Sequence, residues 1–60
     1  MNSKEYKNGL RRSINERKVN LEKVKSLFHR AEAGSDIWKK SGKLYRDILV
    51  SIREMEKQLN

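Results

Sequence analysis

Apolar side chains recur along the first half of the chain at alternating intervals of four and three residues. The repeat runs through Leu10, Ile14, Leu21, Val24, Phe28 and Ala31, with Arg17 in one of its apolar slots. This is the heptad pattern of a helix that packs along a seam, with Ile14 at position a and Arg17 at position d. Ser3 can cap the start of such a helix. The pattern therefore predicts a helix over about residues 3–33, from which Arg17 could reach Glu56.

A second heptad run fills the other half of the chain. Its positions a and d are occupied by Trp38, Ser41, Tyr45, Ile48, Ile52, Met55 and Leu59. The pattern predicts a second helix over about residues 36–59. A glycine inside a helix costs about 1 kcal/mol relative to alanine. Ser41 and Gly42 are therefore the weakest point of this helix, where a kink or a brief break is compatible with the sequence.

The turn between the two runs is expected at residues 34–35. Gly34 has no Cβ atom and can adopt the left-handed conformation that ends a helix. Ser35 and Asp36 are both good N-cap residues for the helix that follows. Two helices joined by so short a connection are antiparallel neighbours.

Antiparallel pairing about this turn places residues whose numbers sum to about 69 in the same layer. Val24 then lies opposite Tyr45, and Ile14 lies opposite Met55. Because the two heptad runs match from end to end, residues 1–60 are expected to form one all-α domain. The predicted architecture is an antiparallel two-helix hairpin that resembles a coiled coil.

The apolar stripe is wider than a two-helix seam requires. Four further apolar residues flank the seam: Leu27, Ile37, Leu44 and Leu49. Leaving a large side chain exposed forfeits roughly 1.5–3 kcal/mol. A second copy would cover these residues, so we expect a homodimeric four-helix bundle. A monomer with a few exposed apolar groups and a docking site for another protein are the alternatives.

The chain is strongly basic, with 15 Lys and Arg against 8 Asp and Glu and a net charge of +7. Four of the cations recur every seven residues along the first helix and form a column, which we call the rail: Lys4, Arg11, Lys18 and Lys25. The rail is about 31 Å long at 1.5 Å per residue. A row of cations attracts a phosphate backbone or an acidic partner. The alternatives are a solvated flank and pairing with acids across a dimer.

A second basic group lies near the aromatic side chains of the second helix. It consists of Lys39, Lys40, Lys43 and Arg46. Basic residues interleaved with aromatic ones can bind single-stranded nucleic acid by stacking and charge. Trp38 and Tyr45 occupy heptad core positions, however, so a structural role is favoured for both rings.

Several functional classes are excluded by composition. The chain has no cysteine, which removes disulfides and cysteine zinc sites, and its single histidine, His29, cannot build a metal site alone. There is no glycine-rich phosphate loop, and a 60-residue hairpin has little room for a small-molecule cleft. No apolar run approaches the roughly 20 residues of a membrane span. We therefore predict no catalytic, cofactor or metal residues, no enzyme activity, no small-molecule substrate, and a cytoplasmic protein.

These observations favour a small non-enzymatic interaction module. We expect it to self-associate and to dock an acidic protein partner, in a regulatory or assembly role. The apolar residues beside the seam would supply contact area, and the rail would steer association. The alternative is a nucleic-acid-binding accessory protein that uses the rail for sequence-independent phosphate contacts.

Overall fold

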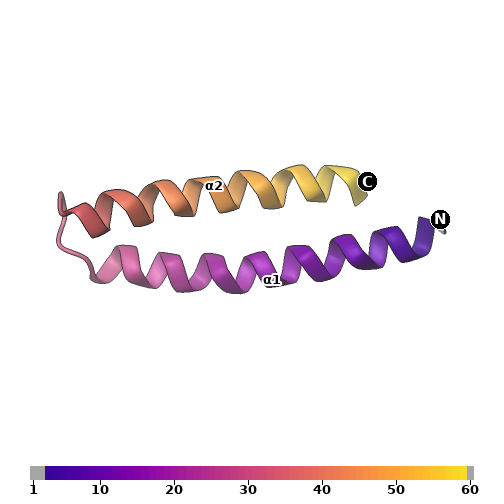
Figure 1. Cartoon of the computed structure of the whole chain (residues 1–60), viewed down its shortest axis with the longest axis horizontal. Coiled ribbons are helices and arrows are strands. Elements are labelled where there is room, and N and C mark those ends of the chain that lie inside the picture. Colours follow the sequence, from indigo (N-terminus) through magenta and orange to yellow (C-terminus); the bar gives the residue numbers. More distant parts are fainter. Residues whose placement is uncertain (1–2, 60) are drawn as a thin grey trace.

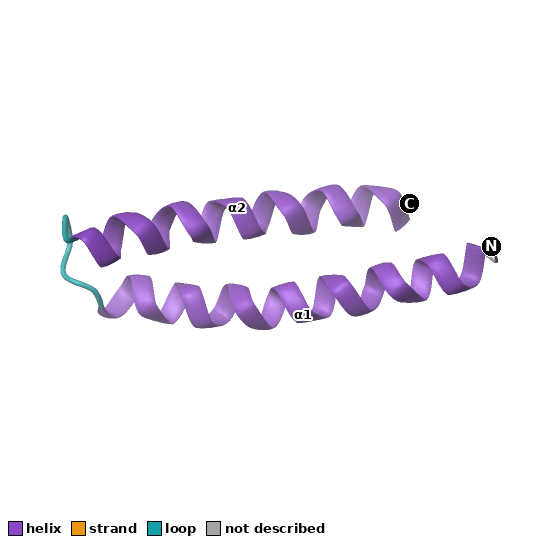
Figure 2. Cartoon of the chain, viewed as in Figure 1, coloured by secondary structure: helices purple, strands orange, loops and turns teal. Residues whose placement is uncertain are grey.

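The computed structural model describes residues 3–59 of the chain as two antiparallel helices. Helix α1 spans Ser3–Arg30 and helix α2 spans Asp36–Leu59, and they lie side by side with one short connection between them (Figures 1 and 2). The hairpin is a rod whose axes measure 47, 15 and 14 Å. Neither helix in the described range is long and apolar enough to cross a membrane. The predicted all-α hairpin is confirmed.

Helix α1 ends three residues before the predicted end at Ala33. The amide of Ala31 donates to the carbonyl of Leu27 at 3.0 Å and closes the last helical turn. A separate β-turn follows, in which the amide of Ser35 donates to the carbonyl of Glu32 at 3.0 Å. Gly34 is the third residue of this turn and has a φ of 88°, as a type II turn requires. The left-handed glycine therefore belongs to the β-turn and does not directly follow the helix.

The start of α2 is capped by Ser35, one of the two predicted cap residues. Its Oγ accepts a hydrogen bond from the amide of Trp38 at 3.2 Å. Its carbonyl accepts another from the amide of Lys39 at 3.0 Å. Asp36 lies in the first turn, where its charge suits the positive end of the helix dipole. The cap and the β-turn together fix the angle at which the chain reverses.

Helix α2 continues without a break through Ser41 and Gly42. Ser41 is buried, and its hydroxyl donates to the carbonyl of Ile37 at 2.6 Å. Gly42 faces the aromatic ring of Phe28 on α1, and a Cβ atom placed on Gly42 would lie only 3.1 Å from the Cε2 of Phe28. The glycine therefore permits a close approach between the helices at this point.

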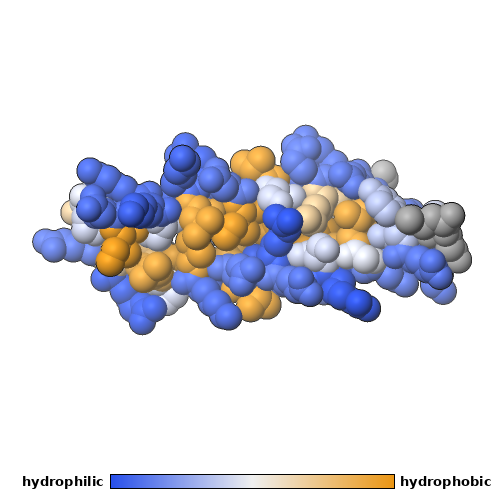
Figure 3. All heavy atoms as spheres, viewed as in Figure 1, coloured by the Kyte–Doolittle hydropathy of each residue, from blue (hydrophilic) through white to orange (hydrophobic). Residues whose placement is uncertain are grey.

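The hydrophobic core is thin. Among the described residues, Ile14 and Ile52 are the only buried apolar side chains, with 4% and 3% of their surface exposed. Most of the other seam residues are half-buried. Apolar side chains remain visible along the middle of the rod, between polar ones on its two long edges (Figure 3).

Contacts between the helices fix their register. They join Tyr6 to Gln58, Arg17 to Ser51, Lys18 to Glu56, Phe28 to Trp38, and Phe28 to Gly42. The residue numbers of these pairs sum to 64–74, centred near the predicted value of about 69. Antiparallel pairing about the turn is therefore observed along the whole length of the hairpin.

Candidate functional site

The hairpin has two long flanks, one on each side of its seam. In an antiparallel pair, heptad positions e of both helices border one flank and positions g border the other. On the first flank, Lys25 of α1 and Gly42 of α2 line the same hollow. On the opposite flank, Leu27 of α1 and Leu44 of α2 line another. The contacts therefore assign each flank its own set of side chains from both helices.

All four cations of the rail are exposed on α1. The Nζ atom of Lys18 lies 3.9 Å from the Oε2 of Glu56, and both side chains are exposed, so this ion pair contributes little stability. Arg11 donates to the Oδ1 of Asn8 at 3.2 Å within α1. Within residues 3–59, the Lys25 ammonium group has neither a hydrogen bond nor an ion pair. Glu56 of α2 thus pairs with the rail at Lys18.

Helix α2 adds a second column of cations beside the rail. Lys39, Arg46 and Arg53 are spaced by seven residues and so share one face of α2. Lys39 and Arg46 line a hollow with Gly42, which places this column on the same flank as Lys25. Sequence reasoning missed Arg53, although its spacing from Arg46 is a sufficient signal. We call the combined surface the basic face: Lys4, Arg11, Lys18, Lys25, Lys39, Arg46 and Arg53.

Three members of the predicted secondary basic group gather around the stacked aromatic rings. Lys39, Lys43 and Arg46 line a hollow of about 430 Å³ whose other walls are Phe28, Trp38 and Gly42. Lys40 does not join them, because its side chain lies on the opposite flank beside Leu27 and Leu44. Consecutive helical residues are about 100° apart, so Lys39 and Lys40 face different sides of α2.

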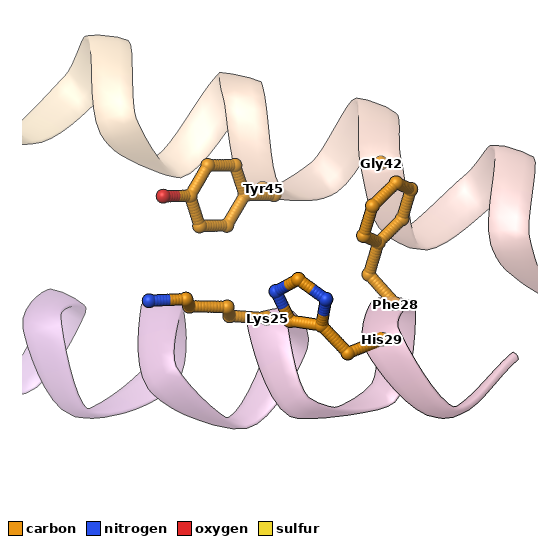
Figure 4. A pocket seen from close by; sticks show the side chains of 5 residues that line it. All are labelled: Lys25, Phe28, His29, Gly42 and Tyr45. Atoms are coloured by element: carbon orange, nitrogen blue, oxygen red, sulfur yellow. The ribbon is translucent and has the colours of Figure 1, made fainter.

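A smaller hollow adjoins this one and shares Phe28 and Gly42 with it. It holds about 210 Å³ and is lined by Lys25, Phe28, His29, Gly42 and Tyr45 (Figure 4). The rings of Phe28 and Trp38 are stacked, with centroids 5.2 Å apart and planes inclined by 22°. His29 meets the edge of Phe28 at a centroid distance of 5.8 Å. We call this space the Gly42 hollow, and sequence spacing alone did not reveal it.

Three apolar side chains are exposed together on the flank opposite the basic face. Leu27, Ile37 and Leu44 retain 44%, 58% and 49% of their surface and line a common hollow. Leu49, which was expected to join them, is half-buried. It follows Gly42 by seven residues and therefore lies on the flank of the Gly42 hollow. The predicted four-residue surface is thus reduced to an apolar patch of Leu27, Ile37 and Leu44.

The rest of this flank is polar. The Nη1 of Arg17 donates to the Oγ of Ser51 and does not reach Glu56, the partner considered from the sequence. Nearer the open end, the Tyr6 hydroxyl donates to the Oε1 of Gln58. These two hydrogen bonds tie α1 to α2 across the flank, and they leave the apolar patch confined to the end of the hairpin near the turn.

The described residues thus form two contrasting surfaces, one on each flank of the hairpin. In the described range, no group of three or more His, Cys, Asp or Glu side chains could hold a metal ion. One flank combines cations with an apolar hollow, and the other carries an apolar patch among balanced charges. Comparison with models of protein families, with curated proteins and with solved structures finds no match for this chain.

Proposed function

We propose that this protein is a small non-enzymatic interaction module with two different docking surfaces. It self-associates through the apolar patch and docks an acidic protein partner through the basic face. The observation that carries this proposal is that excess positive charge lies on one flank and the cluster of exposed large apolar side chains lies on the other. A helical rod with two such surfaces suits a regulatory or assembly role.

Self-association is supported by the thin core. Two buried isoleucines provide little apolar burial for a chain of this length. The apolar patch is the place where apolar side chains from both helices lie exposed next to each other. A two-fold axis through the patch would join two hairpins into a four-helix bundle. Such a dimer buries Leu27, Ile37 and Leu44 of both copies.

Docking of an acidic protein is supported by the basic face. Seven cations lie on this face, where Glu56 pairs with Lys18 and Glu22 lies one helical turn from Lys18 along α1. A surface of one sign raises the association rate of an oppositely charged partner and excludes partners of like charge. The cations extend along both helices, so the partner surface they fit is elongated and acidic.

Binding to nucleic acid is the second candidate, and one specific observation favours it. The rail is exposed along α1, and the column of Lys39, Arg46 and Arg53 runs beside it on α2. Parallel rows of cations can follow a phosphate backbone without contacting base edges. Such binding would be independent of nucleotide sequence.

Fluorescence anisotropy separates these candidates. Labelled acidic peptide, duplex DNA and duplex RNA are each titrated with the wild-type protein and with two triple variants. The first variant removes three of the seven cations of the basic face by Lys18→Gln, Lys25→Gln and Arg46→Gln. The control removes the same charge elsewhere by Lys23→Gln, Arg30→Gln and Lys40→Gln.

We expect the acidic peptide to bind the wild-type protein and the control, and to lose most of its affinity for the first variant. Equal losses in both variants would show that net charge alone matters and would contradict the assignment of the basic face. Binding of the duplexes without binding of the peptide would establish the second candidate in place of the first.

A further inference from the structure

The Gly42 hollow is the place where the basic face has an apolar floor. Phe28 and Gly42 form this floor, and Lys25, His29 and Tyr45 surround it (Figure 4). Lys39, Lys43 and Arg46 border the adjoining hollow on the other side of Phe28. Among the described residues, no carboxylate lines either space. An apolar hollow with Lys25 on its rim and three further cations around the adjoining hollow suits a group that is apolar itself but attached to an acidic chain.

We propose that the Gly42 hollow receives one aromatic side chain from an acidic segment of a protein partner. Carboxylates that flank this aromatic residue in the partner would meet Lys25, Lys39 and Arg46. The inference rests on the proposed docking of an acidic partner and identifies the anchor by which that partner is held.

The size and lining of the hollow fit an aromatic ring. A protein cavity of roughly 150 Å³ is sufficient to bind benzene, and this hollow holds about 210 Å³. Rings pack well against Phe28 in stacked or edge-on geometry. The neighbouring Lys and Arg side chains can also interact with the face of an inserted ring. The Tyr45 hydroxyl and the His29 imidazole at the rim can bind a polar tip, such as that of tyrosine.

Gly42 explains why the hollow exists. A glycine in the middle of a helix costs roughly 0.5–1 kcal/mol relative to alanine. At this position a methyl group would contact the Phe28 ring at 3.1 Å and occupy the floor of the cavity. Gly9, by contrast, has nothing within 4 Å of its corresponding position. The chain therefore provides both a variant that fills the site and a matched control that does not.

Charge and polarity favour an aromatic side chain of an acidic partner over two other occupants of the hollow, a second copy of the chain and a nucleobase. A second copy of the chain would bring its own cations to the basic face, so like charges oppose self-association here. A nucleobase would bring several hydrogen-bonding groups on its edge. The lining offers it the Tyr45 hydroxyl and the His29 ring as polar partners beyond Lys25, and polar groups left unpaired cost binding energy.

Trp38 makes the test direct, because it is the sole tryptophan and stacks on Phe28 beside the hollow. Its fluorescence is followed while the protein is titrated with an acidic peptide that contains one central Phe. The matched peptide has Ala in place of Phe, and a single-stranded oligonucleotide supplies nucleobases. The proteins are the wild type, Gly42→Ala, Gly9→Ala and His29→Glu, the last placing a carboxylate at an exposed position on the rim.

We expect the Phe peptide to bind the wild type about tenfold more tightly than the Ala peptide, as burial of part of a ring predicts. It should also change the Trp38 emission. Gly9→Ala should preserve this difference between the peptides, and Gly42→Ala should abolish it while the Ala peptide still binds. His29→Glu should weaken binding of the Phe peptide, because the new carboxylate repels the acidic chain. This variant leaves Gly42 and the backbone of α2 unchanged.

Three outcomes would overturn the inference. Equal binding of the Phe and Ala peptides to the wild type would remove the aromatic anchor and leave the proposed acidic docking intact. Failure of both peptides to bind would overturn the proposed function together with its anchor. Tighter binding of the oligonucleotide than of the Phe peptide, lost in Gly42→Ala, would assign the hollow to a nucleobase.

Discussion

The two flanks of this hairpin share one core but differ in chemistry. The basic face carries seven Lys and Arg residues with Glu22 and Glu56 nearby. The charged residues bordering the opposite flank are balanced, four cations against four carboxylates: Arg17, Lys23, Arg30, Lys40, Glu16, Glu32, Asp47 and Glu54. Only this balanced flank carries the apolar patch.

This difference shows how a short heptad sequence separates folding from recognition. Side chains at positions a and d pack the helices together. Those beside the seam decide what each flank can approach, because like charges repel and apolar groups associate. In the function proposed above, the hairpin self-associates through the apolar patch and leaves the basic face open to an acidic partner.

The largest expected effect comes from the core that both flanks share. Replacing Ile52 by Ala should lower the free energy of unfolding by about 2–4 kcal/mol, because truncating a buried side chain leaves a cavity. Urea denaturation followed by circular dichroism at one fixed protein concentration measures the change. Val50→Ala, at an exposed position of the same helix, should stay within about 0.5 kcal/mol of wild type. A similar loss of unfolding free energy in both variants would contradict the burial of Ile52 in the core.

The next largest effect concerns self-association, which we expect to depend on one flank only. Leu44→Ser should raise the dissociation constant of the dimer by about tenfold or more, since Leu44 belongs to the apolar patch. Leu49→Ser should leave dimerisation unchanged, because Leu49 lies on the other flank. Sedimentation equilibrium over a concentration series distinguishes the two. Equal effects of the two substitutions would mean that the dimer does not form through the apolar patch.

Salt should affect the two flanks in opposite ways. If four cations of the rail contact phosphates, raising the salt from about 50 to 200 mM should weaken duplex binding about 100-fold. Binding of an acidic peptide should weaken in the same direction. Dimerisation through the apolar patch should not weaken, because screening reduces repulsion between two cationic copies. A parallel loss of dimerisation and anion binding would place both on the basic face.

The smallest expected effect compares two glycines in helical positions. Gly9→Ala should raise the free energy of unfolding by about 0.5–1 kcal/mol, since it adds helix propensity in open space. Gly42→Ala should raise the free energy of unfolding by less than this, or lower it, because its methyl group would lie 3.1 Å from the ring of Phe28. Thermal melts by circular dichroism measure both. An equal gain at both positions would show that the Phe28 ring yields at little cost.

Much of the fold could be predicted from the sequence because its signals are local and periodic. The spacing of Ile14 and Ile52 within their heptads, and the glycine and serine at 34–35, specify two helices and a reversal. Register followed from the position of the turn, since antiparallel helices of known start and end can pair in only one layer order. The end of α1 was placed too late, because Gly34 can serve a β-turn as well as a helix end.

The candidate site was less accessible to sequence reasoning. The rail follows a simple period, but Leu49 was grouped with Leu44 although the two residues face different flanks. Arg17 has a long side chain that can reach either flank. Its hydrogen bond to Ser51 depends on which acceptors lie within reach across the seam. Gly42 looked like a weak point by helix propensity, whereas its role depends on a ring that is 14 residues away in the chain.

The sequence by itself thus determined the two helices, their antiparallel order, their register and the existence of a cationic column. These follow from backbone propensities and from the 3.6-residue period of a helix, which act over short distances along the chain. Only the tertiary structure decided that Gly42 opens a hollow beside Phe28 and that Arg17 bonds to Ser51 instead of Glu56. Such features arise from side chains that meet across the seam, and their shapes and reach are not encoded in the spacing of either helix alone.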